Sequence, residues 1–143
     1  MSFDYNQSIW GQDTASLDPS HPTAIRLFQS LKLLKTLPSD AKILEVGCGA
    51  GQFIRAIKQI IPSSDCYGFD VSEVAINKAK ETADGVNYVL GPGDRWPLAD
   101  NFFDAVVIYD VLEHVESVEQ TMAEIKRVLK PSGLMYAFIP CEG

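Results

Sequence analysis

Residues 42–51 carry the clearest chemical signal in the sequence. A short, mostly apolar run over residues 43–46 is typical of a buried strand, and Gly47, Gly49 and Gly51 follow at alternate positions before helical spacing resumes. A strand that turns through glycines into a helix N-terminus offers backbone N–H groups and a positive dipole end to a ligand. Glycine also permits positive φ and leaves no Cβ between ligand and backbone. The simpler alternative is a tight turn that binds nothing.

The spacing of these glycines disfavours a dinucleotide. The dinucleotide fingerprint is Gly-x-Gly-x-x-Gly, and here Gln52 stands where its third glycine would be. Glu45, one residue before the predicted strand ends, would repel a pyrophosphate. A ligand that carries an amino group suits this carboxylate better.

Further polar residues follow the other predicted strands. Asp70 comes about twenty residues after the glycine turn, where a carboxylate can accept hydrogen bonds from ribose hydroxyls; alternatively it caps the next helix. Asp110, Glu113 and His114 would share one side of a helical turn. They offer too few ligands for a metal, so we expect none. His114 is then either a base for an acceptor or a structural residue.

Composition limits the classes of function. The chain of 143 residues is sufficient for one domain, and its net charge of −7 disfavours nucleic acid or an anionic membrane as a partner. No apolar run approaches the roughly 20 residues that span a bilayer. Three cysteines without a Cys-x-x-Cys pair indicate a reducing compartment, so we expect a cytoplasmic protein.

The elements that must position these residues alternate along the chain. Strands are predicted at residues 42–47, 66–71, 86–90, 104–109 and 134–139, and helices at residues 22–37, 51–61, 72–83 and 117–130. Val118, Met122, Ile125 and Leu129 form the predicted buried stripe of the last helix. This alternation predicts an α/β fold with a parallel sheet and helices on both faces. Residues 1–20 are predicted to form an irregular arm, and residues 21–143 one domain.

The segment from Glu45 to Gly51 resembles the first motif of the class I S-adenosylmethionine-dependent methyltransferases, and the resemblance extends over residues 43–140. It implies a three-layer Rossmann-like sandwich with a mostly parallel sheet, order 3-2-1-4-5. It also implies S-adenosylmethionine as cofactor and in-line methyl transfer to a small-molecule acceptor. The cofactor-binding residues it implies are Glu45, Gly47, Cys48, Gly49, Gly51, Asp70, Val71, Asp94, Arg95 and Tyr109.

The resemblance gives some of these residues a specific role. Val71 would lie against the adenine, Asp94 would accept from the adenine amino group, and the Arg95 N–H would reach a ring nitrogen. Asp110 and His114 are the candidate catalytic residues. Two rival functions stay open: a cofactor-binding protein of this fold without transfer activity, and an NAD-type oxidoreductase domain.

The resemblance also generates an expectation about the edge of the sheet. The family's sheet has seven strands, the last two of them an antiparallel pair, whereas this sequence supplies five. We expect a chain truncated after the fifth strand, with residues 134–139 left as an apolar edge. Pairing of that edge with a second copy would give a symmetric homodimer.

Overall fold

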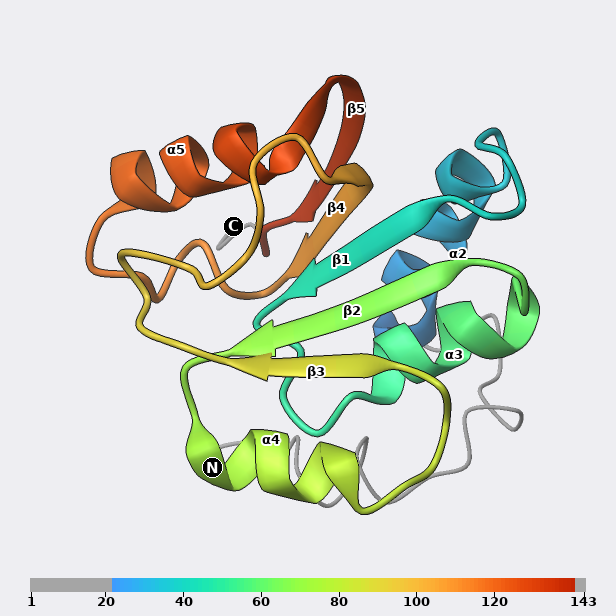
Figure 1. Ribbon diagram of the computed structural model, residues 1–143, viewed down its shortest axis with the longest axis horizontal. Coiled ribbons are helices and arrows are strands. Elements are labelled where there is room, and N and C mark those ends of the chain that lie inside the picture. The colour runs from blue at the N-terminus through green and yellow to red at the C-terminus, as the bar shows by residue number, and fades with distance from the viewer. Residues whose placement is uncertain (1–21, 141–143) are drawn as a thin grey trace.

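The computed structural model describes residues 22–140, and the predicted arm over residues 1–20 lies outside the described residues. Helices and strands alternate along the described chain (Figure 1). Their bounds are α2 (Pro22–Leu34), β1 (Lys42–Val46), α3 (Gln52–Ile60), β2 (Asp65–Asp70), α4 (Glu73–Lys80), β3 (Asn87–Leu90), β4 (Phe103–Tyr109), α5 (Val118–Val128) and β5 (Leu129–Phe138).

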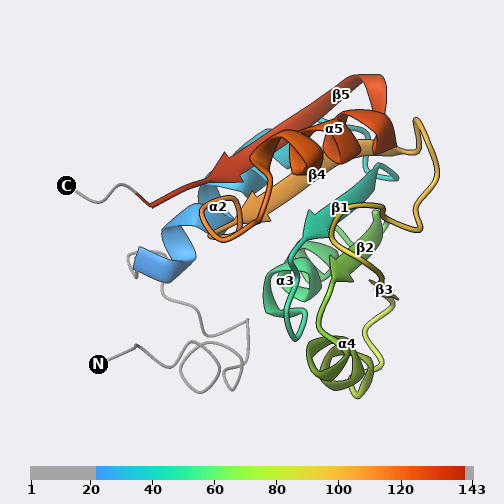
Figure 2. The same cartoon turned by 90° about the vertical axis from the view of Figure 1, so that its left-hand side faces the viewer.

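The five strands form one sheet in the order β3-β2-β1-β4-β5, and all four pairings are parallel. The predicted α/β fold and strand order are therefore confirmed. Because the strands run in one direction, their carboxyl ends meet at one edge of the sheet, as the arrowheads in Figure 2 show. Ligands bind at this edge in sheets of this kind.

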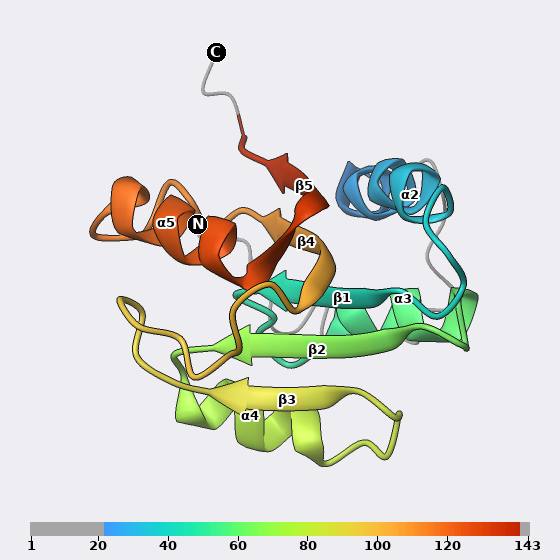
Figure 3. The ribbon, with the colours of Figure 1, turned by 45° about the horizontal axis from the view of Figure 1, so that its top comes forward.

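Two apolar clusters hold the helices on the two faces of the sheet. One cluster joins α2, α3 and α4 to the sheet, with Leu27, Ile57 and Ile76 among its buried side chains. Figure 3 shows α3 behind β1 and β2, and α4 behind β3. The other cluster packs Ile125 and Val128 of α5 on the opposite face. No helix within residues 22–140 combines the length and apolar character needed to cross a membrane.

The junction between α5 and β5 differs from the prediction. The stop signal at residues 130–133 predicted a strand from Leu134, but α5 ends at Val128 and β5 begins at once with Leu129. Leu129 pairs with Phe103 and Leu134 with Ala105, and the register shifts between these pairs. Pro131, which cannot donate a backbone hydrogen bond, lies within this irregularity, where the lost bond is tolerated.

The buried stripe of α5 also differs from the prediction. The residues that α5 buries are Thr121, Ile125 and Val128, whereas Val118 is 49% exposed and Met122 38%. Both stripes share Ile125 and both have helical spacing, so periodicity alone could not separate them. The Thr121 hydroxyl donates to the Ser117 carbonyl at 3.1 Å, which allows this polar side chain to be buried.

Gly68 explains how the loop after β1 can pack closely on β2. A Cβ at this position would meet the Cys48 Sγ at 2.9 Å and the Tyr88 Cδ1 at 3.0 Å. Gly68 and Cys48 are both buried. The small residue therefore lets the glycine turn lie directly against the second strand.

We expect Gly68→Ala to lower the free energy of unfolding by about 1–3 kcal/mol, because the new methyl group overpacks a buried contact. Gly93→Ala is the matched control, since its Cβ would meet Val71 at 3.6 Å, an ordinary contact distance. Urea denaturation of both variants measures the difference. Equal stability of the two variants would contradict the close packing of the loop on β2.

Candidate functional site

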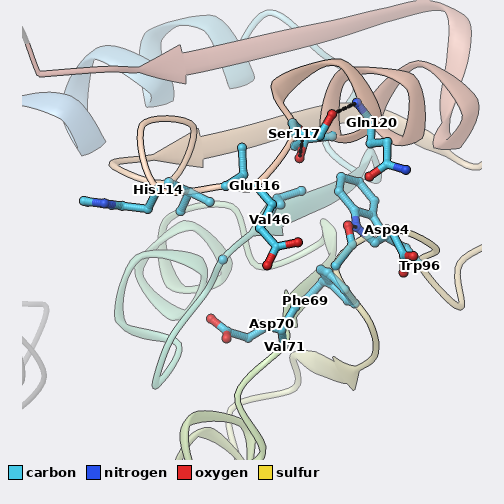
Figure 4. A pocket seen from close by; sticks show the side chains of 15 residues that line it. Val46, Phe69, Asp70, Val71, Asp94, Trp96, His114, Glu116, Ser117 and Gln120 are labelled. Atoms are coloured by element: carbon cyan, nitrogen blue, oxygen red, sulfur yellow. Dashed lines mark hydrogen bonds between the residues drawn. The ribbon is translucent and has the colours of Figure 1, made fainter.

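Two cavities open at the carboxyl edge of the sheet. The larger cavity, of about 650 Å³, lies beyond the ends of β1 and β2 and is closed on another side by the start of α5 (Figure 4). The smaller cavity, of about 390 Å³, lies beyond the ends of β1 and β4. Gly47, Val111 and His114 line both cavities, so the two adjoin at this point.

The glycine turn has the backbone that its sequence predicted. Gly47, Gly49 and Gly51 have φ values of 74°, 55° and 88°, which side chains other than glycine rarely adopt. The N–H groups of Gly47 and Cys48 both donate to the Phe69 carbonyl, at 2.7 and 3.0 Å. The turn is thus fixed to the end of β2.

Only part of the predicted turn faces the cavities. Gly47 lines both, whereas Cys48, Gly49 and Gly51 are not among the lining residues. Cys48 is buried against Gly68, and burial raises the pKa of its thiol. Gly51 faces the Tyr88 hydroxyl, which occupies the space a Cβ would need.

Glu45 lies in the smaller cavity with 2% of its surface exposed. Its Oε1 accepts the N–H of Ile54 in the first turn of α3, at 3.1 Å. Burial raises the pKa of the Glu45 carboxyl well above its ordinary value; the Ile54 N–H lowers it by less, and Asp70 adds to the rise. Glu45 forms no ion pair within residues 22–140, so this part of the chain places a buried acid in the cavity without a cationic partner.

Asp70 joins the end of β2 to the glycine turn. One carboxylate oxygen accepts the Gly49 N–H at 2.8 Å and the other accepts the Ser72 N–H at 2.9 Å. The N-cap of α4 is Ser72, whose hydroxyl accepts the Ala75 N–H at 3.2 Å. Asp70 is therefore not needed as the cap, and it lines the larger cavity beside Val71.

The loop after β3 brings Asp94 to the larger cavity, whereas Arg95 is not a lining residue of either cavity. Trp96 takes part in the wall, and the sequence analysis did not identify it as a site residue. Trp96 as a whole is 3% exposed. Its ring centroid lies 5.2 Å from that of Phe69, and its Nε1 donates to the Gly93 carbonyl at 3.0 Å. An aromatic residue two positions after the Gly-Asp pair was the available signal.

Tyr109 lines the smaller cavity, but its hydroxyl is engaged elsewhere. The hydroxyl lies 2.6 Å from the Ser30 Oγ on α2, and the ring packs 5.0 Å from Phe53. Burial raises the pKa of the Tyr109 phenol. Any contact of Tyr109 with a ligand would therefore come from its ring.

The sequence analysis also missed Arg26, which forms an ion pair with Asp110 in the smaller cavity. Arg26 is 7% exposed and its guanidinium lies over the Phe138 ring at 4.7 Å. Its Nε has no hydrogen-bond partner among residues 22–140. An arginine on a predicted amphipathic helix gives no sequence signal for this pairing, because only the fold brings α2 to the end of β4.

His114 lines both cavities, and its side chain is 77% exposed. Its Nε2 lies 3.4 Å from the Glu113 Oε1. Within the described residues, no three His, Cys, Asp or Glu side chains are grouped so that they could hold a metal ion. The three residues that share the turn after β4 do not converge, since Asp110 faces Arg26.

The burial of Glu45 generates a prediction about stability. We expect Glu45→Gln to raise the free energy of unfolding of the ligand-free chain by about 1–3 kcal/mol at pH 7, because an amide oxygen can still accept the Ile54 N–H and folding no longer requires the uptake of a proton. Between the ordinary glutamate pKa and its raised value, the folded chain holds a proton that the unfolded chain releases. The wild-type chain therefore loses stability as pH rises through this range, and the variant does not.

Urea denaturation at a series of pH values measures this difference. Glu81→Gln is the control, because Glu81 is exposed and its loss should leave the pH dependence unchanged. A Glu45→Gln variant less stable than wild type at pH 7 would show that the carboxylate is stabilised in the folded chain.

Comparison with known proteins agrees with this geometry. A family model described as "Methyltransferase domain" matches residues 44–137. The 24-methylenesterol C-methyltransferase 2 of Arabidopsis thaliana is 34% identical over 144 residues, which cover 95% of this chain and 37% of that protein. The ubiquinone/menaquinone biosynthesis C-methyltransferase UbiE of Desulfotalea psychrophila is 29% identical, covering 67% and 40% respectively.

A solved structure of a methyltransferase has a similar fold. A SAM-dependent methyltransferase from Aquifex aeolicus superposes with a TM-score of 0.66 at 27% identity, covering 81% of this chain and 69% of that one. The chain spans 37% and 40% of the length of the two curated relatives. With the glycine turn, the 3-2-1-4-5 sheet and a family match over residues 44–137, the chain belongs to the class I S-adenosylmethionine-dependent methyltransferases, whose cofactor is S-adenosylmethionine.

Proposed function

We propose that the protein transfers the methyl group of S-adenosylmethionine to a small-molecule acceptor by in-line displacement. The observation that carries this proposal is the placement of three carboxylates around the two adjoining cavities. Glu45 lies at the end of β1, Asp70 at the end of β2 and Asp94 after β3. Their order along the site suits the amino group, the ribose and the base of one extended ligand.

The smaller cavity suits the amino-acid end of the cofactor. Glu45 offers a buried acid for an ammonium group, and the Arg26 Nε is a buried donor without a hydrogen-bond partner within residues 22–140. A cavity that holds a carboxylate and a guanidinium matches a ligand with an ammonium and a carboxylate group. Gly47 and Val111 line both cavities, and only glycine fits at position 47, because a Cβ there would clash with the Val111 side chain.

The larger cavity suits the adenosine end. Each Asp70 oxygen accepts one N–H and keeps a lone pair free for a ribose hydroxyl. Phe69, Val71 and Trp96 supply apolar surface for a flat base, and Asp94 lies on the same wall. We also propose that the backbone N–H of Arg95 donates to a ring nitrogen of the adenine, although Arg95 is not a lining residue of the cavity.

Methyl transfer requires the chain mainly to orient the cofactor and the acceptor and to exclude water from the site. The sulfonium of the cofactor supplies an activated methyl group, so proximity and alignment account for most of the rate enhancement. His114, at the junction of the two cavities, is the better placed of the two candidate bases. Asp110 forms an ion pair with Arg26, so its carboxylate is already engaged and less available to an acceptor.

The acceptor class rests on the relatives. One is named for methylation of a sterol and the other for ubiquinone and menaquinone biosynthesis, and sterols and quinones are small molecules. The net charge of −7 disfavours nucleic acid as the acceptor. The rival without transfer activity would bind the cofactor and methylate none of a panel of sterol, quinone and amine acceptors. The NAD-type rival is disfavoured by Gln52 at the position of the third glycine.

We expect the chain to bind S-adenosylhomocysteine in preference to NADH, and Asp70→Ala to weaken that binding by about 1.5–3 kcal/mol through the loss of a charged acceptor. Titration calorimetry measures both. Asp65→Ala is the matched control, because Asp65 begins the same strand at the edge away from the cavities. Preference for NADH would end the methyltransferase proposal, and unchanged affinity of Asp70→Ala would exclude Asp70 as the ribose ligand.

We also propose that β5 pairs with β5 of a second copy. Among residues 22–140, β5 has β4 as its only strand partner, and Ile139 just after it is 51% exposed. Sedimentation equilibrium should then show a dimer, and hydrogen exchange of β5 should slow as the concentration rises. A monomer at high concentration with fast exchange in β5 would contradict this pairing.

A further inference from the structure

Two charged residues of α5, Glu124 and Arg127, bind the loop between β3 and β4 near Trp96. Closer to β4, the N–H groups of Asn101 and Phe102 donate to the Arg127 and Val128 carbonyls, at 2.9 and 2.8 Å. Glu124 and Arg127 form a bidentate ion pair, with Arg127 Nε donating to Glu124 Oε1 at 2.9 Å and Nη2 donating to Oε2 at 2.7 Å. The same pair also bonds the backbone of the loop. Neither residue lines either cavity.

The pair holds the backbone of Trp96 from both sides. The Trp96 N–H donates to the Glu124 Oε2 at 2.8 Å, and its carbonyl accepts from the Arg127 Nη2 at 3.0 Å. Arg127 Nη1 also donates to the Leu98 carbonyl at 2.7 Å and to the Asp100 carboxylate at 2.6 Å. One guanidinium therefore fixes three positions of a loop that has no regular secondary structure of its own.

The electrostatics of the pair agree with a fixed arrangement. The hydrogen bond from Arg127 lowers the pKa of Glu124, although burial opposes this, and the bond to Glu124 raises the pKa of Arg127. The Glu124 side chain is 13% exposed and that of Arg127 30%, so water screens the pair only in part. A planar guanidinium is required, because an ammonium cannot make two parallel bonds to one carboxylate.

We infer that Glu124 and Arg127 are positioning residues. They hold Trp96 where its side chain forms the wall of the larger cavity that would contact the adenine. The side chain of Trp96 lies at the cavity beside Asp94 and above Phe69 (Figure 4). The pair acts on the ligand only through this indole and the loop that carries it. The inference rests on the proposed function, since it takes the larger cavity to hold the adenosine.

The test uses Trp96 as its own reporter. The chain has two tryptophans, so Trp10→Phe leaves Trp96 as the only one. In this background we expect Arg127→Lys to shift the indole emission to longer wavelength without ligand, and to weaken S-adenosylhomocysteine binding about tenfold. Glu124→Gln, which breaks the same pair from the other side, should do both to a similar extent.

Two comparisons separate positioning from a general loss of stability. Lys130→Gln removes an ion pair of 2.9 Å with Asp104 at the other end of β4, and should change neither emission nor affinity. Binding of 5′-methylthioadenosine, which keeps the base and ribose but lacks the amino-acid end, should weaken by the same factor as S-adenosylhomocysteine. A loss confined to S-adenosylhomocysteine would overturn the inference.

The outcomes distinguish this inference from the proposed function. If the parent chain binds S-adenosylhomocysteine while Arg127→Lys leaves emission and affinity unchanged, the inference is wrong and the proposed function stands. If the parent chain binds no S-adenosylhomocysteine, the proposed function is wrong, and the adenosine part of the inference is lost with it. An equal emission shift and loss of affinity in Lys130→Gln would also overturn the inference.

Discussion

The site depends on one constraint, the parallel alignment of β1, β2 and β4. This alignment brings the carboxyl ends of three strands that are distant in sequence to one edge, so that Glu45, Asp70 and Asp110 meet around two adjoining cavities. The N–H groups of Gly47 and Cys48 then bind the Phe69 carbonyl at the end of β2. Without the parallel pairing of β1 and β2, the glycine turn would have no fixed position relative to Asp70.

The site is electrostatically costly for the folded chain. Burial raises the pKa of Glu45, and Asp70 adds to this by repulsion. Such an arrangement lowers stability until a cation neutralises it, which is a known compromise at binding sites. An ammonium group on the ligand would remove part of that cost, so the same burial that destabilises the free chain would favour the complex. Asp110 is different, because Arg26 already neutralises it.

Three loops of the site are held by contacts with distant elements. Arg26 of α2 fixes the turn after β4, and Glu124 with Arg127 of α5 fixes the loop after β3. Arg55 of α3 donates to Asp84 at 2.8 Å and to the Ala50 carbonyl at 3.3 Å, which ties the glycine turn to the α4–β3 connection. Each of these three contacts is made by an arginine, whose planar guanidinium can donate to two or more acceptors at once.

The sequence by itself determined the fold class, the glycine turn and the acidic residues at the strand ends, because these depend on local patterns: apolar periodicity, glycine spacing and the residue that follows each strand. Only the tertiary structure decided which of these residues face the cavities. It placed Gly47, Glu45 and Asp70 in the cavity walls and left Cys48, Gly51 and Arg95 outside them. It also chose Thr121 and Val128 over Val118 and Met122 as the buried face of α5. The roles of Arg26, Trp96 and Arg127 could not be predicted, because each depends on a partner far along the chain that only the packed sheet brings within hydrogen-bonding distance.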